Sequence, residues 1–222
     1  MPVPVPLVQL DRSGTRLSPD RAAWAAAREH FAQHHWLRLP QFLAPGLLGL
    51  VHRGIALGTF REVRHAAVVL PSTNLELRAG PTTVLLHLVC NDRVLLDALE
   101  DLAASGPLAS FHGFVYRMSA AHEDHWHSDL VDERRLALSL NVGQEGYEGG
   151  VLQIRDARSH AVLAEPDNHV AGSALVFRLD AALEHRVAPV TGGAKTAFAG
   201  WFRGAGSFAE RLRGAAAEVI PS

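Results

Sequence analysis

The chain has 222 residues, of which 48% are hydrophobic and 20% are charged, a composition typical of a globular protein with a substantial core. Its formal net charge of −2 gives no reason to expect a nucleic acid or an anionic membrane as a partner. A single cysteine, Cys90, excludes an internal disulfide, and no apolar run reaches membrane-spanning length. Because the N-terminus also lacks the pattern of a signal peptide, we expect a cytoplasmic protein of one domain.

The first hundred residues alternate between patterns of helix and strand. Residues 1–17 indicate an irregular arm or an edge strand, because alternating prolines remove donors from a β-ladder. Polar capping residues and prolines then mark the starts of helices. We expect helices from Ser18, as N-cap, to about His34, from Pro45 to about Ile55, and from Asn91, as N-cap, to Ala104, with short strands at 36–39 and 66–70. Residues 82–89 fit either a helix start or a buried strand.

Beyond residue 108 the pattern changes to short runs of strand-forming residues separated by turn signals. Strands are predicted at 111–118, 123–129, 136–142, 150–155, 161–164, 174–178, 184–189 and 196–203, and a helix only from about Ser207. Eight short strands after a helical first half predict a mostly β fold, a double-stranded β-helix (jelly roll) braced by α-helices. Within one domain, residues 1–107 would be the support region, 108–203 the jelly-roll core and 204–222 a C-terminal helix or tail.

One histidine-rich segment of the predicted core carries side chains that bind metals. It contains two H-x-D triplets, His122/Asp124 and His127/Asp129. Residues two apart in a strand point to the same face, so each pair could converge on one ion, but the two triplets have opposite parity. His125 shares the parity of His127, which makes His125, His127 and Asp129 a third possibility. The pattern of residues alone leaves these alternatives open.

A later predicted strand supplies a second imidazole, His185. Two imidazoles and one carboxylate are the donors of a facial triad, which holds iron(II) on one face and leaves the opposite positions open. Ten residues after His185 comes Lys195, the only lysine in the chain, at the start of an apolar strand. A lysine there either extends its amine to solvent at the strand end or pairs with an anion in a pocket. The triad on the preceding strand favours the anion.

Several short motifs occur in the order and at the spacing of a known family. They are Tyr116, Trp126–Asp129, Leu138–Asn141, Tyr147–Ile154 and the stretch from His185 to Lys195. In these motifs, which lie within residues 108–203, the chain resembles the iron(II)- and 2-oxoglutarate-dependent oxygenases, particularly the branch related to prolyl 4-hydroxylases. The chain departs from some relatives at Ser139, where they carry a tyrosine, so its cosubstrate pocket is expected to differ there.

The resemblance implies that His127, Asp129 and His185 bind iron(II). It also implies that Lys195 pairs with the distal carboxylate of 2-oxoglutarate and that Tyr116 hydrogen-bonds the same carboxylate. By the same resemblance, Gly149-Gly150 is a turn whose role is to supply positive φ. His122, Asp124 and His125 then lie near the site or on the surface.

The function that this resemblance implies is hydroxylation, or another oxidation, of an unactivated C–H bond in a small molecule or a peptide. O2 would be consumed and 2-oxoglutarate decarboxylated to succinate. Asp129 favours this outcome because a related subgroup has a small residue there and binds halide instead. Candidate substrate contacts are the Arg134-Arg135 pair, Arg155 and, favoured by their position beside the distal histidine, Arg178 and Arg186, with His125 as a further candidate.

Two other classes of protein compete with this interpretation. One is a jelly-roll binding or structural protein in which the triad is vestigial or holds a non-catalytic metal. The other is a cupin-type metalloprotein that does not use 2-oxoglutarate. Lys195 argues against both, because neither class needs a lysine at this spacing after His185.

Overall fold

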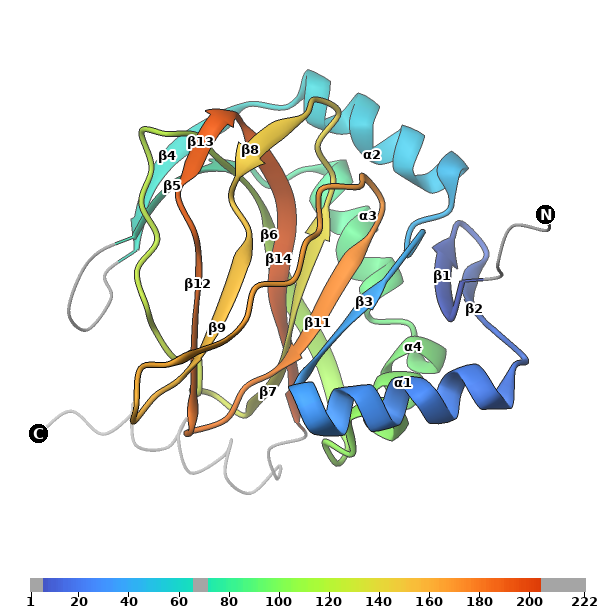
Figure 1. Ribbon diagram of the computed structural model, residues 1–222. Helices are drawn as coiled ribbons and strands as arrows, with labels where there is room; N and C mark the ends of the chain where they lie inside the picture. The colour runs from blue at the N-terminus through green and yellow to red at the C-terminus, as the bar shows by residue number, and fades with distance from the viewer. Residues whose placement is uncertain (1–5, 66–71, 205–222) are drawn as a thin grey trace, which may run out of the picture.

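The computed structural model describes residues 6–65 and 72–204 (Figure 1). The predicted strand at 66–70 and the predicted helix from Ser207 lie outside these residues. In the described part, a layer of helices packs against one face of a large antiparallel sheet, and smaller sheets lie against its other face (Figure 1). This arrangement confirms the predicted helix-braced jelly roll. No helix among the described residues is both long and apolar enough to cross a membrane.

Four helices form the bracing layer: α1 (Arg21–His34), α2 (Pro45–Leu57), α3 (Pro81–Cys90) and α4 (Arg93–Ala103). The ambiguous stretch at 82–89 is therefore helix. Two predicted caps are wrong by one or two residues. Asp20, not Ser18, caps α1, because its carboxylate accepts from two backbone N–H groups of the first turn. Asp92 caps α4, while the side chain of Asn91 instead joins the end of α3 to the sheet through Phe111.

The major sheet has seven antiparallel strands in the order β3-β11-β7-β14-β6-β5-β4. Their bounds are β3 (Trp36–Leu39), β4 (Phe60–His65), β5 (Ser72–Leu77), β6 (Leu108–Met118), β7 (Arg134–Asn141), β11 (Ala174–Arg178) and β14 (Lys195–Gly204). The long strand β14 lies between β6 and β7 and pairs with both along most of its length. At the N-terminus, the predicted arm is a hairpin of β1 (Val8–Asp11) and β2 (Gly14–Leu17).

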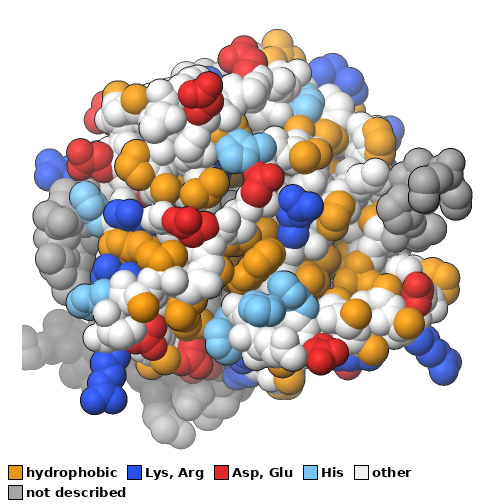
Figure 2. All heavy atoms as spheres, viewed as in Figure 1, with side chains coloured by type: hydrophobic (Ala, Val, Ile, Leu, Met, Phe, Trp, Pro, Cys, Tyr) orange, Lys and Arg blue, Asp and Glu red, His pale blue; other side chains and the backbone are white. Residues whose placement is uncertain are grey.

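The second layer of the jelly roll contains two smaller sheets. One, the minor sheet, has the order β10-β9-β12, with β9 (Leu152–Asp156), β10 (Val162–Ala164) and β12 (Leu183–Val187). The other pairs β8 (Tyr147–Gly149) with β13 (Val190–Gly193). Gly149, the last residue of β8, and Gly150, which follows it, have φ of 70° and 63°, which confirms the predicted positive φ at this turn. On the face seen in Figure 2, acidic and basic side chains are interspersed with hydrophobic ones and form no large patch of one charge.

Alternation along β14 assigns each side chain to one of two compartments. Phe198 and Phe202, both fully buried, pack into the core between the major sheet and the helices. Each contributes roughly 2–3 kcal/mol by leaving water. Lys195, Ala197 and Trp201 have the opposite parity, and Ala197 and Trp201 pack with residues of the space between the two layers of strands. The pleat of one strand thus separates the structural core from the space that holds the site.

The predicted strand at 123–129 is wrong. This segment is irregular and makes one isolated antiparallel bridge, between His127 and His185. Its shape comes from contacts with β5, where Thr73 N donates to Glu123 O at 2.9 Å and Ser72 Oγ donates to Asp124 at 2.9 Å. These partners lie about fifty residues earlier in the sequence, so no local pattern could reveal them.

Candidate metal centre

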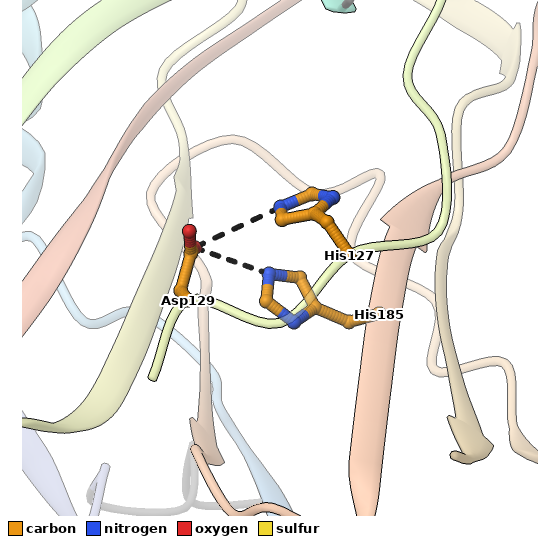
Figure 3. Close-up of side chains that lie close together, drawn as sticks. All are labelled: His127, Asp129 and His185. Carbon is orange, nitrogen blue, oxygen red and sulfur yellow. Dashed lines mark ion pairs between the residues drawn. The ribbon is translucent and has the colours of Figure 1, made fainter. Parts of the chain in front are cut away.

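Three side chains from two segments converge at the wall of the jelly roll (Figure 3). His127 and Asp129 come from the irregular segment, and His185 comes from β12. Oδ2 of Asp129 lies 3.8 Å from Nε2 of His127 and 3.3 Å from Nε2 of His185. Within the described residues, this is the only group of three whose candidate ligand atoms all lie within 4.8 Å of one another. Two imidazoles and a carboxylate at this spacing fit a divalent transition metal.

Backbone contacts fix which nitrogen of His127 faces the other two ligands. Its Nδ1 lies 2.6 Å from the carbonyl oxygen of His125. A carbonyl only accepts hydrogen bonds, so Nδ1 carries a proton, and Nε2 is the nitrogen that would bind a metal after losing its own proton. The bridge to His185 is also made by the backbone, with N–H···O distances of 3.1 Å and 2.9 Å. The two rings are therefore oriented before any ion binds.

The electrostatics of the cluster favour a positive charge at its centre. Burial alone would raise the pKa of Asp129, but hydrogen bonds with His127 and His185 hold that pKa well below its usual range. Burial alone would lower the pKa of His127, but Asp129 and the nearby Asp124 raise it to about 9. The carboxylate is thus ionised, and it stabilises a cation beside it.

Two further side chains hold the carboxylate of Asp129. The indole Nε1 of Trp201 donates to Oδ2 at 2.6 Å, and Nη1 of Arg134 donates to Oδ1 at 3.3 Å. The guanidinium of Arg134 also lies over the Trp201 ring, with Cζ 3.7 Å from the centroid. Trp201 is not among the site residues predicted from the sequence. It could have been found from parity, because Trp201 is six residues from Lys195 on one strand and so shares its face.

The other H-x-D triplet serves the fold of the segment. Asp124 accepts from Ser72 Oγ at 2.9 Å and from the backbone N of Val187 at 2.7 Å, so it ties the segment to β5 and β12. Nδ1 of His122 is bonded within its own turn, to Ser119. The structure brings His127 and Asp129 together with His185, whereas His122 and Asp124 are not part of this group.

A pocket of about 890 Å³ opens beside the three side chains. Aromatic and aliphatic residues form much of its wall, including Phe114, Leu152, Phe177 and Val187. Polar residues line it too, among them Glu123, His125, Arg155 and Glu184. Its volume is in the range of pockets that take drug-sized ligands. There is room for a cosubstrate and for part of a second molecule.

Lys195 is only 3% exposed and lies on the same face of β14 as Trp201. Its Nζ donates to the carbonyl of Gly150 at 2.7 Å. Burial lowers the pKa of Lys195 to about 8, although the charge of Asp124 acts in the opposite direction. A buried amine bonded to a carbonyl retains most of its charge at neutral pH and can accept an anion as a better partner.

Tyr116 lies beside this strand, on β6, with its backbone paired to Ala197. Its side chain lines the pocket, as does Ser139 on β7, the strand on the other side of β14. Burial raises the pKa of Tyr116 above its ordinary value, so the phenol stays protonated and can donate. Two hydroxyls and one amine thus lie on neighbouring strands of the same sheet.

The predicted substrate contacts lie at different places. His125 lines the pocket, with Nε2 3.5 Å from the carboxylate of Glu123. Arg178 packs over Phe31 and donates to a helix carbonyl, that of Ala103. Arg186 stacks against Trp126, with Cζ 4.6 Å from the ring centroid. Neither arginine is among the residues that line the pocket, and their substrate roles stay predictions.

Comparisons with known proteins agree with this geometry. Residues 113–203 match the family model of the 2OG-Fe(II) oxygenase superfamily. A prolyl-4-hydroxylase from Pseudomonas putida has a similar structure (TM-score 0.58, 19% identity, 82% of this chain and 100% of that chain covered). The α-ketoglutarate-dependent epimerase SnoN from nogalamycin biosynthesis also has a similar structure (TM-score 0.58, 14% identity, 84% of this chain and 84% of that chain covered). No curated protein matches the sequence.

A third similar structure is a prolyl hydroxylase from Trichoplax adhaerens in complex with a peptide fragment of hypoxia-inducible factor (TM-score 0.53, 14% identity, 82% and 89% covered). At such identities these structures show a shared fold. The family match covers β6 to β14, the strands that carry or surround the three metal-binding side chains. The matched region, residues 113–203, thus has the sequence pattern and the converging metal-binding side chains of a 2OG-Fe(II) oxygenase domain, which supports a non-haem dioxygenase that uses iron(II) and 2-oxoglutarate.

Proposed function

We propose that this enzyme hydroxylates, or otherwise oxidises, an unactivated C–H bond of a substrate bound in the pocket beside His127, Asp129 and His185. The observation that carries the proposal is the convergence of these three donors at the wall of a pocket of about 890 Å³. With iron(II) and 2-oxoglutarate bound there, O2 supplies the oxidising power, and 2-oxoglutarate leaves as succinate and carbon dioxide. The tasks of the protein are to bind, to orient and to exclude water.

His127, Asp129 and His185 would hold the iron through Nε2, Oδ2 and Nε2. Support comes from the carbonyl of His125, which keeps the proton of His127 on Nδ1 and leaves Nε2 free to bind. Further support comes from the ionised state of Asp129. Three protein ligands suit this chemistry, because the remaining positions stay open for the cosubstrate and for oxygen.

Lys195 would pair with the distal carboxylate of 2-oxoglutarate, and Tyr116 would hydrogen-bond the same group. Lys195 is buried, and its amine is bonded to a neutral carbonyl. A carboxylate arriving there would gain a charge-assisted hydrogen bond inside an apolar wall. Ser139, which lines the same pocket, would be a third donor in the place where some relatives carry a tyrosine.

The substrate would be a small molecule or one residue of a peptide. The apolar wall favours an uncharged reacting segment, and Phe114, Phe177 and Trp201 would shield it from water. The similar structures include one enzyme bound to a peptide and one from the biosynthesis of a small molecule. This fold thus serves both kinds of substrate.

Succinate formation tests the proposal directly. Apo-protein is loaded with iron(II) without air, mixed with 2-oxoglutarate and exposed to O2, alone and with pools of proline-containing peptides and of apolar small molecules. We expect 2-oxoglutarate to bind, a pool to raise succinate production, and a component of that pool to gain one oxygen atom. Protein that holds iron yet neither binds 2-oxoglutarate nor turns it over would contradict the proposal and favour a cupin-type or purely binding role.

A further inference from the structure

The carboxylate of Asp129 has two partners beyond the histidines, Trp201 and Arg134, which together with it form what we name the inner trio. We propose that Trp201 and Arg134 are positioning residues that hold Asp129 as a ligand through one oxygen, Oδ2. This inference rests on the proposed iron site. It adds two residues that bind neither iron nor cosubstrate but set the geometry of a group that does.

The two carboxylate oxygens of Asp129 have different partners, which supports this role. Oδ2 is the oxygen nearest both histidine nitrogens, at 3.8 Å and 3.3 Å, and it accepts the indole N–H of Trp201 at 2.6 Å. Oδ1 faces the guanidinium of Arg134 at 3.3 Å. With Oδ1 held in this way, the carboxylate cannot turn to offer both oxygens to one ion. A second bound oxygen would occupy a position that the cosubstrate or O2 needs.

The inner trio is rigid because its two outer members support each other. Arg134 Cζ lies 3.7 Å from the centroid of the Trp201 ring, and only 16% of the Arg134 side chain is exposed. Both residues belong to paired strands, where Trp201 lies opposite Ala137 and Arg203 opposite Arg134. The positions of the two donors are thus set by the register of β7 and β14, independently of the irregular segment that carries Asp129.

This arrangement solves a specific structural problem. Asp129 comes from a segment with no regular ladder, whereas His185 is fixed by β12. An unrestrained carboxylate on such a segment would sample several rotamers, and ordering it would weaken metal binding. Partners of ligating carboxylates typically account for about 10- to 100-fold in metal affinity. We therefore expect loss of the indole N–H to weaken iron binding by about tenfold.

The test compares Trp201→Phe and Arg134→Leu with wild-type protein and with a matched control. Arg155→Gln is that control, because Arg155 also lines the pocket, stacks on a tryptophan and pairs with a carboxylate, but that carboxylate is Glu184. Iron(II) affinity is measured without air by competition with a coloured chelator. The visible charge-transfer absorption of iron(II) with the chelating 2-oxo acid is recorded on the same samples.

We expect Trp201→Phe and Arg134→Leu each to weaken iron binding by about tenfold and to shift or broaden the absorption, while Arg155→Gln leaves both unchanged. Thermal unfolding of each apo-protein identifies a variant that fails to fold, and the other variant then decides. Wild-type affinity and absorption in both inner-trio variants would overturn the inference, even if KM for a substrate rose, because Trp201 would then be a substrate contact. A wild-type protein that binds no iron would instead refute the proposed function.

Discussion

Two clusters, each of an arginine, a tryptophan and an acidic residue, lie beside one pocket, and they differ in what surrounds the carboxylate. The inner trio is Arg134, Trp201 and Asp129. The second, which we name the rim trio, is Arg155, Trp126 and Glu184. In each, an arginine stacks on the tryptophan, at 3.7 Å and 4.4 Å from the ring centroid.

The contacts between arginine and carboxylate explain the difference. Arg155 contacts one oxygen of Glu184 through Nε at 2.7 Å and Nη2 at 2.6 Å, so this pair is tight and largely satisfied by itself. Arg134 makes a longer contact of 3.3 Å with Asp129, whose other oxygen faces Trp201 and two histidines. An arginine, a tryptophan and an acidic residue thus make a closed ion pair in one place and leave a carboxylate able to bind a metal in the other.

Removal of each carboxylate in turn should give the largest difference between the two trios. Asp129→Ala deletes the central negative charge and one proposed ligand, so we expect iron binding and succinate formation to fall below detection. Glu184→Ala removes the equivalent group of the rim trio, and we expect iron affinity within about twofold of wild type, because Glu184 is not among the three converging donors. Calorimetry or chelator competition measures both. Equal loss in the two variants would mean that the rim trio also supports the metal site.

The histidines beside the inner trio give a second contrast of large effect. His127→Ala removes the ring nitrogen Nε2 that faces Asp129, and we expect it to abolish iron binding. His122→Ala disrupts only a turn contact with Ser119, so iron affinity should stay near the wild-type value. The measurement is the iron content of protein loaded without air and then desalted. Iron retained by His127→Ala and lost by His122→Ala would assign the site to the other triplet.

Lys195 extends the comparison to a third cation, whose amine is bonded to a carbonyl rather than to an acid. Its pKa is lowered by burial from 10.5 to about 8, so the free protein releases this proton as the pH rises through about 8. If the ammonium pairs with 2-oxoglutarate, the dissociation constant should rise up to tenfold per pH unit above pH 8 and stay flat between pH 6.5 and 7.5. Equilibrium binding to the iron-loaded protein measures this dependence.

Lys195→Met is the control for that pH profile. It should weaken 2-oxoglutarate binding at pH 7 by at least tenfold, since one charge-assisted hydrogen bond is lost. The remaining binding should no longer change near pH 8. The effect of Lys195 on folding stability is the opposite of its effect on cosubstrate binding. Because its pKa is lower in the folded protein, the buried charge lowers the free energy of unfolding in full at pH values below about 8. We therefore expect the cosubstrate-free Lys195→Met protein to unfold at the same or a higher temperature.

The convergence of His127, Asp129 and His185 could be predicted from the sequence, because it involves few residues and the motifs around them occur in a fixed order. The helix-braced jelly roll could also be predicted, because strand periodicity is a local property of the sequence. The strand predicted at residues 123–129 was wrong, because the shape of this segment depends on contacts with Ser72 and Thr73. Trp201 was not predicted: parity could have shown which face of β14 it lies on, but its hydrogen bond to Asp129 depends on a segment 72 residues away.

The smallest expected effect concerns the rim trio alone. Arg155→Gln removes a guanidinium that contacts both Glu184 and Trp126, and the two paired side chains are only 17% and 26% exposed. We expect the free energy of unfolding to fall by on the order of 1 kcal/mol, the usual size of one such ion pair with its ring contact. Urea unfolding of the single variants and of Arg155→Gln with Glu184→Gln measures their coupling. Because the pair is closed on itself, the coupling should account for most of the loss, and iron affinity should not change. Iron binding that weakened along with stability would show that the two trios are not independent.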